Sequence, residues 1–417
     1  MVDILPSETP LWQSMEAAAM EVLSGYGYEE IRLPIIEATQ LFARSIGEVT
    51  DIVEKEMYSF ADRNDESMTL RPEGTAGCVR AVVQHNLAQN PQRLWYMGPM
   101  FRYERPQKGR QRQFHQLGVE AFGVATPDQD AELIAISRQL WRRLGIDDAL
   151  TLEINSIGSP GDRARYRDAL VDYLSEHREQ LDPDSQRRLE SNPLRILDSK
   201  NTETQAILND APALQDYLDE ESRREFDQLL AYLGKLDIPF VVNQRLVRGL
   251  DYYNKCVFEW TTVHLGAQST VCGGGRYDGL VATFGGKPTP AAGFAIGLER
   301  LILLMQALDI TVSSPADLYV ITADEAALRH ALPRVDQLRS QFPGLDIVQH
   351  LGGGSFKSQF KRADKSGAAW ALVYGEAEVA AGQVTLKPLR VDAEQRTIDD
   401  AALAGFLSDY LATVESA

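Results

Sequence analysis

The alternation of apolar and polar residues predicts helices and strands in the first part of the chain. Residues 12–23 and 131–143 place apolar side chains at the spacing of an amphipathic helix. Residues 93–103 and 113–123 are apolar and aromatic runs typical of strands. The segment between these strands is polar and basic, so we predict that the two strands form a hairpin with a long loop.

The pattern changes further along the chain. From about residue 160 to 240, charged and helix-favouring sequence predicts a separate helical insertion. Strand-like sequence resumes at 240–250, a glycine turn is predicted at Gly273–Gly275, and residues 293–306 read as a short strand followed by a helix. After Pro315, strand-like runs at 317–323, 346–351, 370–375 and 384–389 alternate with helical ones at about 325–341, 355–366 and 399–413, which indicates a compact α/β unit.

Length and composition set broad limits on the protein class. The chain of 417 residues is too long for one hydrophobic core, so we expect two or three domains. It is 44% hydrophobic and 24% charged, as is ordinary for a soluble globular protein. No apolar run is long enough for a membrane span, and the first residues lack the basic and apolar regions of a secretory signal.

Cysteine and histidine usage bears on location and on metal binding. The 3 cysteines stand in no CxxC spacing, which favours a reducing, cytoplasmic compartment and argues against a zinc knuckle. The 6 histidines include no HxxH or HExxH pair. We therefore predict no protein-held metal site.

The net charge of −18 opposes binding to nucleic acid, because phosphate groups attract positive charge. Two short segments nevertheless reverse the sign locally. Either one alone is most simply a solvated face, but an acidic surface around two basic patches would confine a polyanion to those patches. The basic residues are Arg102, Arg105, Lys108, Arg110 and Arg112 in the first segment, and Lys357, Lys361, Arg362 and Lys365 in the second.

The glycine-rich loops that usually hold nucleotides are absent from the sequence. No GxGxxG opens a helix after a strand, and residues 352–358 fail the phosphate-loop spacing, so they read as a glycine turn before a helix. Arginine side chains are the alternative means of holding a nucleotide, because fixed guanidinium groups bind phosphate oxygens in bidentate fashion. Arginines at predicted strand ends or in turns are Arg71, Arg102, Arg248, Arg276 and Arg300.

Five segments carry a family resemblance. They are LRPEGT from Leu70, FRYERPQKGRQRQFHQLGVE from Phe101, VRGLDYY from Val247, GGGRYDGL from Gly273 and GLERL from Gly297. In this order they resemble the histidyl-tRNA synthetase family, and the similarity runs along nearly the whole chain. The first segment is shared with other class II aminoacyl-tRNA synthetases, and the second and fifth resemble class motifs 2 and 3. The third and fourth are the histidine-specific signals.

The resemblance implies a pocket for histidine. Glu73 and Thr75, helped by Gln116, would hold the α-ammonium group. Glu120 and Tyr253 would hydrogen-bond the two imidazole nitrogens, which present one donor and one acceptor when the ring is neutral. Such a pocket penalises an amino acid that leaves its buried groups unpaired. The histidine site so implied comprises Glu73, Thr75, Arg102, Gln116, Glu120, Arg248, Tyr252, Tyr253 and Tyr277.

The resemblance also implies an ATP site and two catalytic arginines. Arg102 would grip the histidine carboxylate and the α-phosphate, and Arg300 would clamp the triphosphate, with Arg110 beside them. Arg248 would lie near the α-phosphate, so Arg248 and Arg102 are the expected catalytic residues. Adenylate formation is an in-line displacement in which positioning and charge stabilisation supply most of the catalysis. The implied cofactors are ATP and Mg²⁺, with the magnesium ion held mainly by phosphates and water.

The implied fold is α+β. A class II antiparallel sheet flanked by helices would occupy 1–158 and 232–312, a helical insertion 159–231, and a C-terminal α/β anticodon-binding domain 316–417. Residues 10–37 resemble motif 1, which builds the dimer interface in this class, so we expect a homodimer. The expected partner is tRNA(His), contacted by Arg105, Gln107, Lys357, Lys361 and Arg362. In the family a few residues, an Arg-Gly pair among them, usually precede the position of Met1.

Two other functions remain open from the sequence. A synthetase-like paralogue without the anticodon-binding domain is a non-catalytic regulatory subunit of ATP phosphoribosyltransferase, and the C-terminal unit and the RGLDYY segment count against it. A class II synthetase for proline or threonine shares the Arg-Pro-Glu segment, but the two histidine-specific segments and the lack of zinc-ligand spacing count against these. The expected activity is ATP-dependent activation of L-histidine to histidyl-adenylate and its transfer to tRNA(His).

Overall fold

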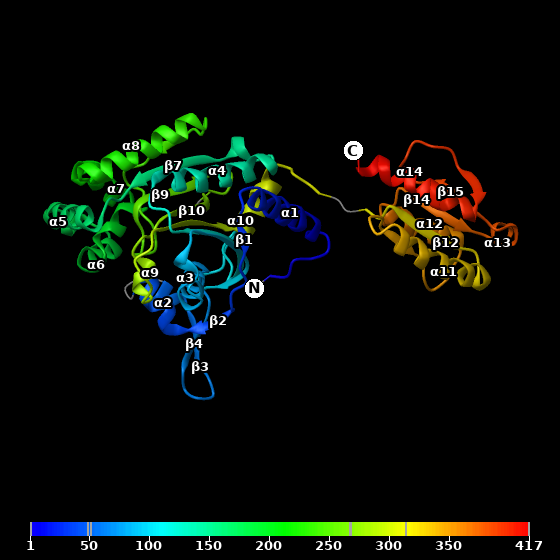
Figure 1. Ribbon diagram of the computed structural model, residues 1–417, viewed down its shortest axis with the longest axis horizontal. Helices are drawn as coiled ribbons and strands as arrows, with labels where there is room; N and C mark the ends of the chain where they lie inside the picture. The colour runs from blue at the N-terminus through cyan, green and yellow to red at the C-terminus, as the bar shows by residue number, and fades with distance from the viewer. Residues whose placement is uncertain (1, 48–49, 51, 267–268, 313–314, 416–417) are drawn as a thin grey trace. The chain divides into compact units, whose positions relative to one another are not determined.

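The computed structural model describes residues 2–47, 50, 52–266, 269–312 and 315–415 (Figure 1). The chain divides into two compact units, Met1–Val312 and Ser313–Ala417. The fold is α+β, as the sequence predicts. None of the helices in the described ranges combines the length and the apolar character that crossing a membrane requires.

The first unit is built on an eight-stranded sheet. Its strand order is β1-β5-β6-β11-β10-β9-β7-β8, and every neighbouring pair is antiparallel except β1 with β5 and β7 with β8. The strands are β1 Glu29–Glu30, β5 Gln92–Phe101, β6 Gln113–Phe122, β7 Thr151–Ser156, β8 Val241–Val242, β9 Asn254–Thr261, β10 Thr270–Arg276 and β11 Ala291–Gly297.

The predicted hairpin is confirmed. Strands β5 and β6 pair in continuous antiparallel register from Gln92–Phe122 to Phe101–Gln113, within two residues of the predicted bounds. The short strand and helix predicted at 293–306 are confirmed as β11 and α10 (Leu298–Ala307). The β5–β6 hairpin and the β11–α10 segment could be predicted from sequence because their apolar residues follow a regular period.

Two local predictions are wrong. Gly273–Gly275 form no turn but lie inside β10, where a side chain on Gly274 would overlap the Gly293 carbonyl of β11. These glycines allow a close approach between strands rather than a change of direction. The stretch 240–250 contributes only the two residues of β8, and turns and irregular chain follow up to residue 253. The apolar side chains of Leu246, Val247 and Leu250 pack into the core that contains α5, but the backbone there does not pair with a neighbouring strand.

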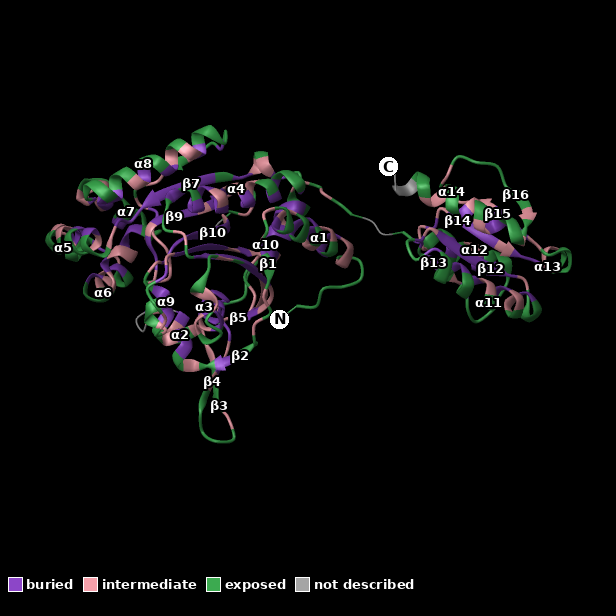
Figure 2. Ribbon diagram, in the orientation of Figure 1, coloured by how far each residue is buried: buried purple, intermediate pink, exposed green. Residues whose placement is uncertain are grey.

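Helices cover both faces of the large sheet. On one face α1 (Thr9–Gly25), α4 (Pro127–Arg143), α8 (Glu220–Lys235) and α10 form one core with the sheet. A buried contact in this core joins Trp260 Nε1 of β9 to Ser137 Oγ of α4 at 2.8 Å. On the other face the main helices are α3 (Thr75–Gln84) and α5 (Pro160–Glu176). Figure 2 shows the strands mostly buried and the outer helix faces exposed.

The charged stretch between β7 and β8 is helical, as predicted. It contains α5, α6 (Pro183–Ser191), α7 (Thr202–Leu208) and α8, all within the first compact unit. Each helix begins where a short polar side chain accepts a backbone N–H, which satisfies one of the unpaired donors at a helix start. The capping residues are Ser159, Asp182, Asn201 and Asp219.

A smaller antiparallel sheet extends the first unit. Its order is β2 (Ile36–Ala38), β4 (Ser67–Leu70) and β3 (Tyr58–Ala61), and α2 (Thr39–Ile46) follows β2 directly. The chain then passes from β4 through residues 71–74 into α3. This path carries the start of α3 to the large sheet, where the candidate site lies.

The second unit is a five-stranded sheet with helices. In the order β13-β12-β14-β15-β16, β12 is parallel to β13 and β14, and the remaining pairs are antiparallel. The four predicted strands are confirmed, whereas β16 and α13 were not predicted. The elements are β12 Leu318–Thr322, α11 Glu325–Gln341, β13 Ile347–Gln349, α12 Phe356–Lys365, β14 Trp370–Tyr374, α13 Glu376–Ala381, β15 Gln383–Pro388, β16 Arg396–Asp399 and α14 Leu403–Glu415.

The predicted glycine turn before α12 is confirmed. Gly352, Gly353 and Gly354 have φ angles of 84°, 63° and 107°, a region that side-chain-bearing residues rarely adopt. Ser355 then caps α12 through its side chain. The glycines therefore serve the turn, and no phosphate loop is formed.

Candidate active site

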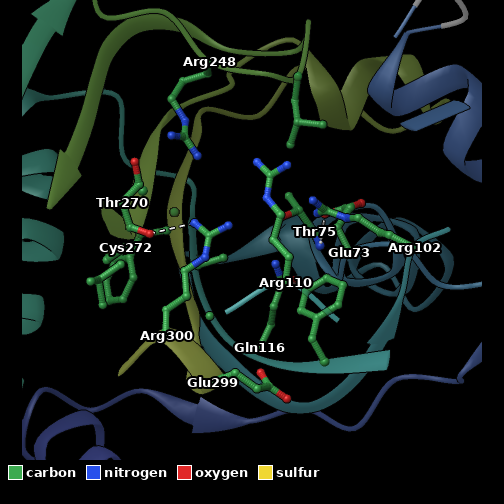
Figure 3. Close-up of a pocket in the computed structure, with 18 of the residues that line it drawn as sticks. Glu73, Thr75, Arg102, Arg110, Gln116, Arg248, Thr270, Cys272, Glu299 and Arg300 are labelled. Atoms are coloured by element: carbon green, nitrogen blue, oxygen red, sulfur yellow. Dashed lines mark hydrogen bonds between the residues drawn. The ribbon is translucent and has the colours of Figure 1, made fainter. Parts of the chain in front are cut away.

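A cavity of about 190 Å³ opens on the large sheet beside the start of α3 (Figure 3). Strands β6, β10 and β11 contribute to its walls, together with the chain around residue 250 and the start of α10. Figure 3 shows the side chains of Arg110, Arg248 and Arg300 converging on its middle. The predicted site residues that line it are Glu73, Thr75, Arg102, Arg110, Gln116, Glu120, Arg248, Tyr252, Tyr253 and Arg300.

Glu120 forms the buried end of the cavity. Its Oε1 accepts hydrogen bonds from Thr75 Oγ1 at 2.8 Å and from the Tyr96 hydroxyl at 2.9 Å, and its Oε2 accepts one from Tyr277. Tyr277 therefore stands behind the carboxylate and not in the lining. In its deprotonated form the carboxylate offers about four acceptor positions, so one position on Oε2 then stays open. A side chain on Gly293 would overlap this oxygen, so the glycine makes room for it.

The Glu120 carboxyl has an unusual proton affinity. Burial raises its pKa to about 8, although the three hydroxyl donors oppose the rise. The ordinary value is 4.5, so the folded state binds the proton more tightly than the unfolded state does. The stability that this proton contributes is complete below the unfolded pKa and is lost as the pH rises through the folded pKa.

Replacing Glu120 with Gln should remove this pH dependence. We expect the difference in unfolding free energy, wild type minus Glu120→Gln, to fall as the pH rises from about 4.5 to about 8 and then to level off. Urea unfolding of both proteins at a series of pH values measures it. Subtracting the variant cancels the other titrating carboxyls. A difference that stays flat over this range would show that folding does not raise the pKa of Glu120.

Glu73 and Gln116 form a second polar group in the cavity. The Glu73 carboxylate accepts the backbone N–H of Thr75 at 2.6 Å and of Ala76 at 2.9 Å, which caps the start of α3. Burial raises the pKa of Glu73 against these hydrogen bonds. The Gln116 Oε1 is buried and lacks a hydrogen-bond partner among the described residues. A buried acceptor without a donor is rare, so this oxygen suits a cationic donor from a ligand.

The guanidinium groups of Arg102, Arg110 and Arg300 also line the cavity, and Figure 3 shows Arg102 next to Glu73. Arg102 is held by the Pro72 carbonyl at 2.8 Å and lies over the Phe114 ring at 5.2 Å. Arg300 donates to the Thr270 carbonyl at 2.7 Å. Burial, and next the nearby Arg110, lower the pKa of Arg300. This mutual repulsion favours a polyanion such as a triphosphate, because its charge would offset the repulsion.

Arg248 lies in the irregular chain before β9. Its guanidinium forms an ion pair with Glu259 of β9. The guanidinium also lies directly over Gly273, because a Cβ on that residue would be only 2.6 Å from Arg248 Nη1. Glu259 also accepts from Thr270 Oγ1 at 2.8 Å. Burial is the largest single effect and favours the neutral form of Arg248, but Glu259 together with Tyr253 and Tyr252 outweighs it, so the pKa is raised. A permanent positive charge is thus fixed at the cavity wall.

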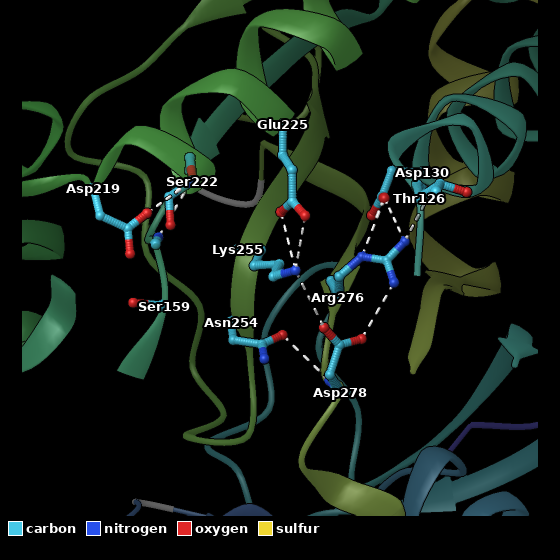
Figure 4. A network of polar contacts seen from close by, with 12 residues as sticks. Thr126, Asp130, Ser159, Asp219, Ser222, Glu225, Asn254, Lys255, Arg276 and Asp278 are labelled. Carbon is cyan, nitrogen blue, oxygen red and sulfur yellow. Dashed lines mark hydrogen bonds and ion pairs between the residues drawn. The ribbon is translucent and has the colours of Figure 1, made fainter. Parts of the chain in front are cut away.

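Two of the five arginines singled out by the sequence lie outside the cavity. Arg71 donates to the carbonyls of Pro99 and Leu33 at 2.8 Å and 2.9 Å. Arg276 pairs with Asp130 at 2.6 Å and Asp278 at 3.2 Å (Figure 4). Apart from Asp278, the partners come from segments far along the chain, which the sequence could not reveal, and neither arginine belongs to the cavity lining.

The residues predicted to contact tRNA are exposed. Arg105 and Gln107 lie in the loop between β5 and β6, which Gln107 and Arg110 close with mutual backbone hydrogen bonds of 3.1 Å and 2.9 Å. Lys357, Lys361 and Arg362 lie on the exposed face of α12 in the second unit.

The sequence missed several polar residues of the site. Glu104 is 3.3 Å from Arg110 and 3.9 Å from Arg102, and Glu259 anchors Arg248. Glu259 carries a signal in hindsight, since its carboxylate stands among the apolar residues Val257, Phe258 and Trp260. Tyr96 and Thr270 carry none, because tyrosine and threonine are ordinary strand residues.

No group of three or more His, Cys, Asp or Glu side chains suited to a metal ion occurs within the described ranges. Mg²⁺ usually keeps several waters and binds one or two carboxylates together with substrate phosphates. Glu104 and Glu299 line the cavity beside the arginines and could supply such a carboxylate. The donor set therefore fits a magnesium ion that arrives with a nucleotide.

An antiparallel sheet that carries this arginine-rich cavity, with a separate α/β unit after it, defines a class II aminoacyl-tRNA synthetase. Residues 1–301 match the family described as histidyl-tRNA synthetase, and residues 317–410 match the anticodon-binding domain family. The chain belongs to the histidyl-tRNA synthetase family.

Solved structures agree with this assignment. The apo histidyl-tRNA synthetase of S. aureus is 36% identical, with 97% of each chain covered and a TM-score of 0.81. The histidyl-tRNA synthetase of Nostoc is 22% identical, with 99% and 98% covered and a TM-score of 0.71. An ATP phosphoribosyltransferase regulatory subunit/histidyl-tRNA synthetase of Bacillus halodurans is 23% identical, with 87% of this chain and 94% of that chain covered and a TM-score of 0.63. The last two, below 25% identity, show the fold alone.

Proposed function

We propose that the protein activates L-histidine with ATP and transfers it to tRNA(His). The observation that carries the proposal is the open acceptor on Glu120, which faces a cavity of amino-acid size lined by Tyr253. An imidazole N–H would donate to Glu120, and the Tyr253 hydroxyl would serve the other ring nitrogen. Glu73 and Thr75, with the unpartnered Gln116 oxygen, would hold the α-ammonium group.

The chemistry needs no general base, because the histidine carboxylate is itself the nucleophile. Its oxygen attacks the α-phosphorus of ATP and pyrophosphate leaves. Arg102 would align the carboxylate with the α-phosphate, and Arg110 and Arg300 would bind the other phosphates. Arg248 would stabilise the charge that develops at the α-phosphate. Magnesium would neutralise phosphate charge, with Glu104 or Glu299 as a carboxylate ligand.

The transfer step brings in tRNA. The terminal hydroxyl of the tRNA attacks the acyl carbonyl, and AMP leaves. Arg105 and Gln107 are exposed at the rim of the site and would reach the acceptor end. Lys357, Lys361 and Arg362 form an exposed basic face on α12, which would contact the anticodon stem-loop. The domain division that we propose is a catalytic domain at 1–158 and 232–312, a helical insertion at 159–231 and an anticodon-binding domain at 316–417.

We also propose a homodimer in the cytoplasm. Large apolar side chains are exposed at the start of the chain and on the small sheet, a feature that marks interaction surfaces. They are Val2 at 70%, Ile4 at 40%, Leu5 at 54%, Ile35 at 43%, Ile36 at 45% and Phe60 at 45% exposed.

Pyrophosphate exchange with each of the twenty amino acids tests the activity, and we expect histidine alone to support it. The Tyr253→Phe variant should raise the histidine KM by the equivalent of about 1–3 kcal/mol, because an imidazole nitrogen would lose its buried partner. The ATP KM should stay close to the wild-type value. An unchanged histidine KM would remove Tyr253 from the recognition of the ring.

The alternative function is a non-catalytic regulatory subunit of ATP phosphoribosyltransferase. The relative from Bacillus halodurans carries both descriptions, which is the observation that keeps this alternative open. The anticodon-binding match at 317–410 and the four arginines of the cavity favour the enzyme. Histidine binding without any pyrophosphate exchange by the wild-type protein would favour the regulatory subunit.

A further inference from the structure

The chain that carries Arg248, Tyr252 and Tyr253 is held by the helical insertion. Arg163 of α5 donates from Nη1 to the Tyr253 carbonyl at 2.6 Å. Asn192, which follows α6, donates from Nδ2 to Asp251 Oδ1 at 2.9 Å. The segment before β9 is therefore tied to α5 and to the end of α6 at two points, both outside the sheet.

A third attachment fixes the turn into β9. Lys255 has a φ of 50°, a left-handed conformation that non-glycine residues adopt at a cost. Its backbone bonds to Gly158 and Ile157, at 2.9 Å and 2.7 Å, just before α5 begins. Its side chain reaches Glu225 of α8 at 3.0 Å (Figure 4). The strained residue thus persists because the chain that leads into the insertion and α8 near the end of the insertion both hold it.

The same network reaches the carboxylate that closes the cavity. Figure 4 shows Lys255 between Glu225 and Asp278, and Asp278 next to Arg276. Tyr277 lies between Arg276 and Asp278 in the sequence and donates to Glu120. Tyr253, which would contact the imidazole, and Tyr277, which orients Glu120, are therefore both connected through hydrogen bonds and ion pairs to residues of the insertion.

Resting on the proposed function, we propose that Arg163 is a positioning residue for histidine binding, through which the helical insertion fixes the place of Tyr253. Arg163 does not touch the substrate. It holds the backbone of the residue that does, and a charge-assisted hydrogen bond to a carbonyl is stronger and more directional than a neutral one. Loss of the bond leaves the Tyr253 backbone free to shift. In an active site, a misplacement of about 1 Å costs roughly 100-fold in rate.

The partial burial of Arg163 supports a specific contact rather than a solvated charge. Its Nε is buried without a hydrogen-bond partner among the described residues, and burial lowers its pKa even with Asp251 nearby. An arginine retained in such a setting needs a strong acceptor. The Tyr253 carbonyl supplies that acceptor at 2.6 Å.

Isothermal titration of histidine into the full-length Arg163→Met variant tests the inference. Methionine keeps an apolar stem but removes every donor. We expect the histidine Kd to rise by about 10-fold or more, with the ATP KM within about twofold of wild type. Arg163→Lys, which keeps one charged donor, should recover part of the loss. The matched control is Arg167→Met on the same helix, where the arginine is 55% exposed and pairs with its neighbour Asp168, and it should bind histidine like wild type.

The outcomes separate this inference from the proposed function. An unchanged histidine Kd in Arg163→Met overturns the positioning role. So does an equal rise in the histidine and ATP constants together with a lower melting temperature, since that is the result of general destabilisation. If the wild type binds histidine but exchanges no pyrophosphate, the proposed catalysis fails while the Kd comparison still decides the role of Arg163. A wild type that binds no histidine overturns both.

Discussion

Arg248→His is expected to slow the formation of histidyl-adenylate by about 10²- to 10³-fold, the usual cost of one lost charge-stabilising contact in a transition state. The histidine KM should change much less, which is the signature of an interaction made mainly in the transition state. The physical basis is a positive charge that Glu259 holds at the cavity wall, on a side chain that is only 18% exposed. Single-turnover adenylation with purified protein measures the rate.

A structural role for Arg248 predicts a different result. If the arginine served only to pair with Glu259, then Glu259→Gln should slow adenylation as much as Arg248→His does. We instead expect Glu259→Gln to lower the melting temperature and to keep more of the rate, because the guanidinium remains. Thermal melts of both variants, with the exposed Arg167→His as control, complete the test. Wild-type-like adenylation by Arg248→His would remove Arg248 from catalysis.

Ending the chain at Val312 is expected to separate the two steps of the reaction. The first unit carries every residue of the cavity, so adenylate formation should stay near the wild-type rate. Charging of tRNA should fall by about 10²- to 10⁴-fold in kcat/KM, the gain that a second linked binding module typically provides. Pyrophosphate exchange and aminoacylation on the same preparation measure the two steps.

A charge-reversal variant distinguishes RNA contact from a loss of structural support. In the full chain, Lys357→Glu with Lys361→Glu changes only exposed side chains of α12. We expect it to weaken charging in the same direction as the truncation, and to reduce the dependence of tRNA affinity on salt, because fewer counterions are released. Efficient charging by the chain that ends at Val312 would mean that the second unit has another role.

The period of apolar residues determined much of the fold from sequence. The β5–β6 hairpin, β11 with α10, and the helix at Glu325–Gln341 follow regular patterns, and such patterns survive folding because burial stabilises one face of each element. The short, irregular elements did not follow any period. The 240–250 stretch is apolar without being a strand, and the glycines of β10 are close-packing residues rather than turn residues.

For the candidate site, too, the sequence predicts one part and only the tertiary structure shows the other. The sequence alone determined which residues belong together, because the segments around Glu73, Arg102, Glu120, Arg248 and Arg300 each carry a family motif, and all five side chains line one cavity. Only the tertiary structure decided what each group is paired with. Ion pairs and hydrogen bonds join residues that are far apart along the chain, as between Arg163 and Tyr253, and such pairings leave no periodic trace in sequence. For this reason only the folded chain shows that Arg276 holds Asp130, that Glu259 pairs with Arg248 and that Arg163 bonds to Tyr253.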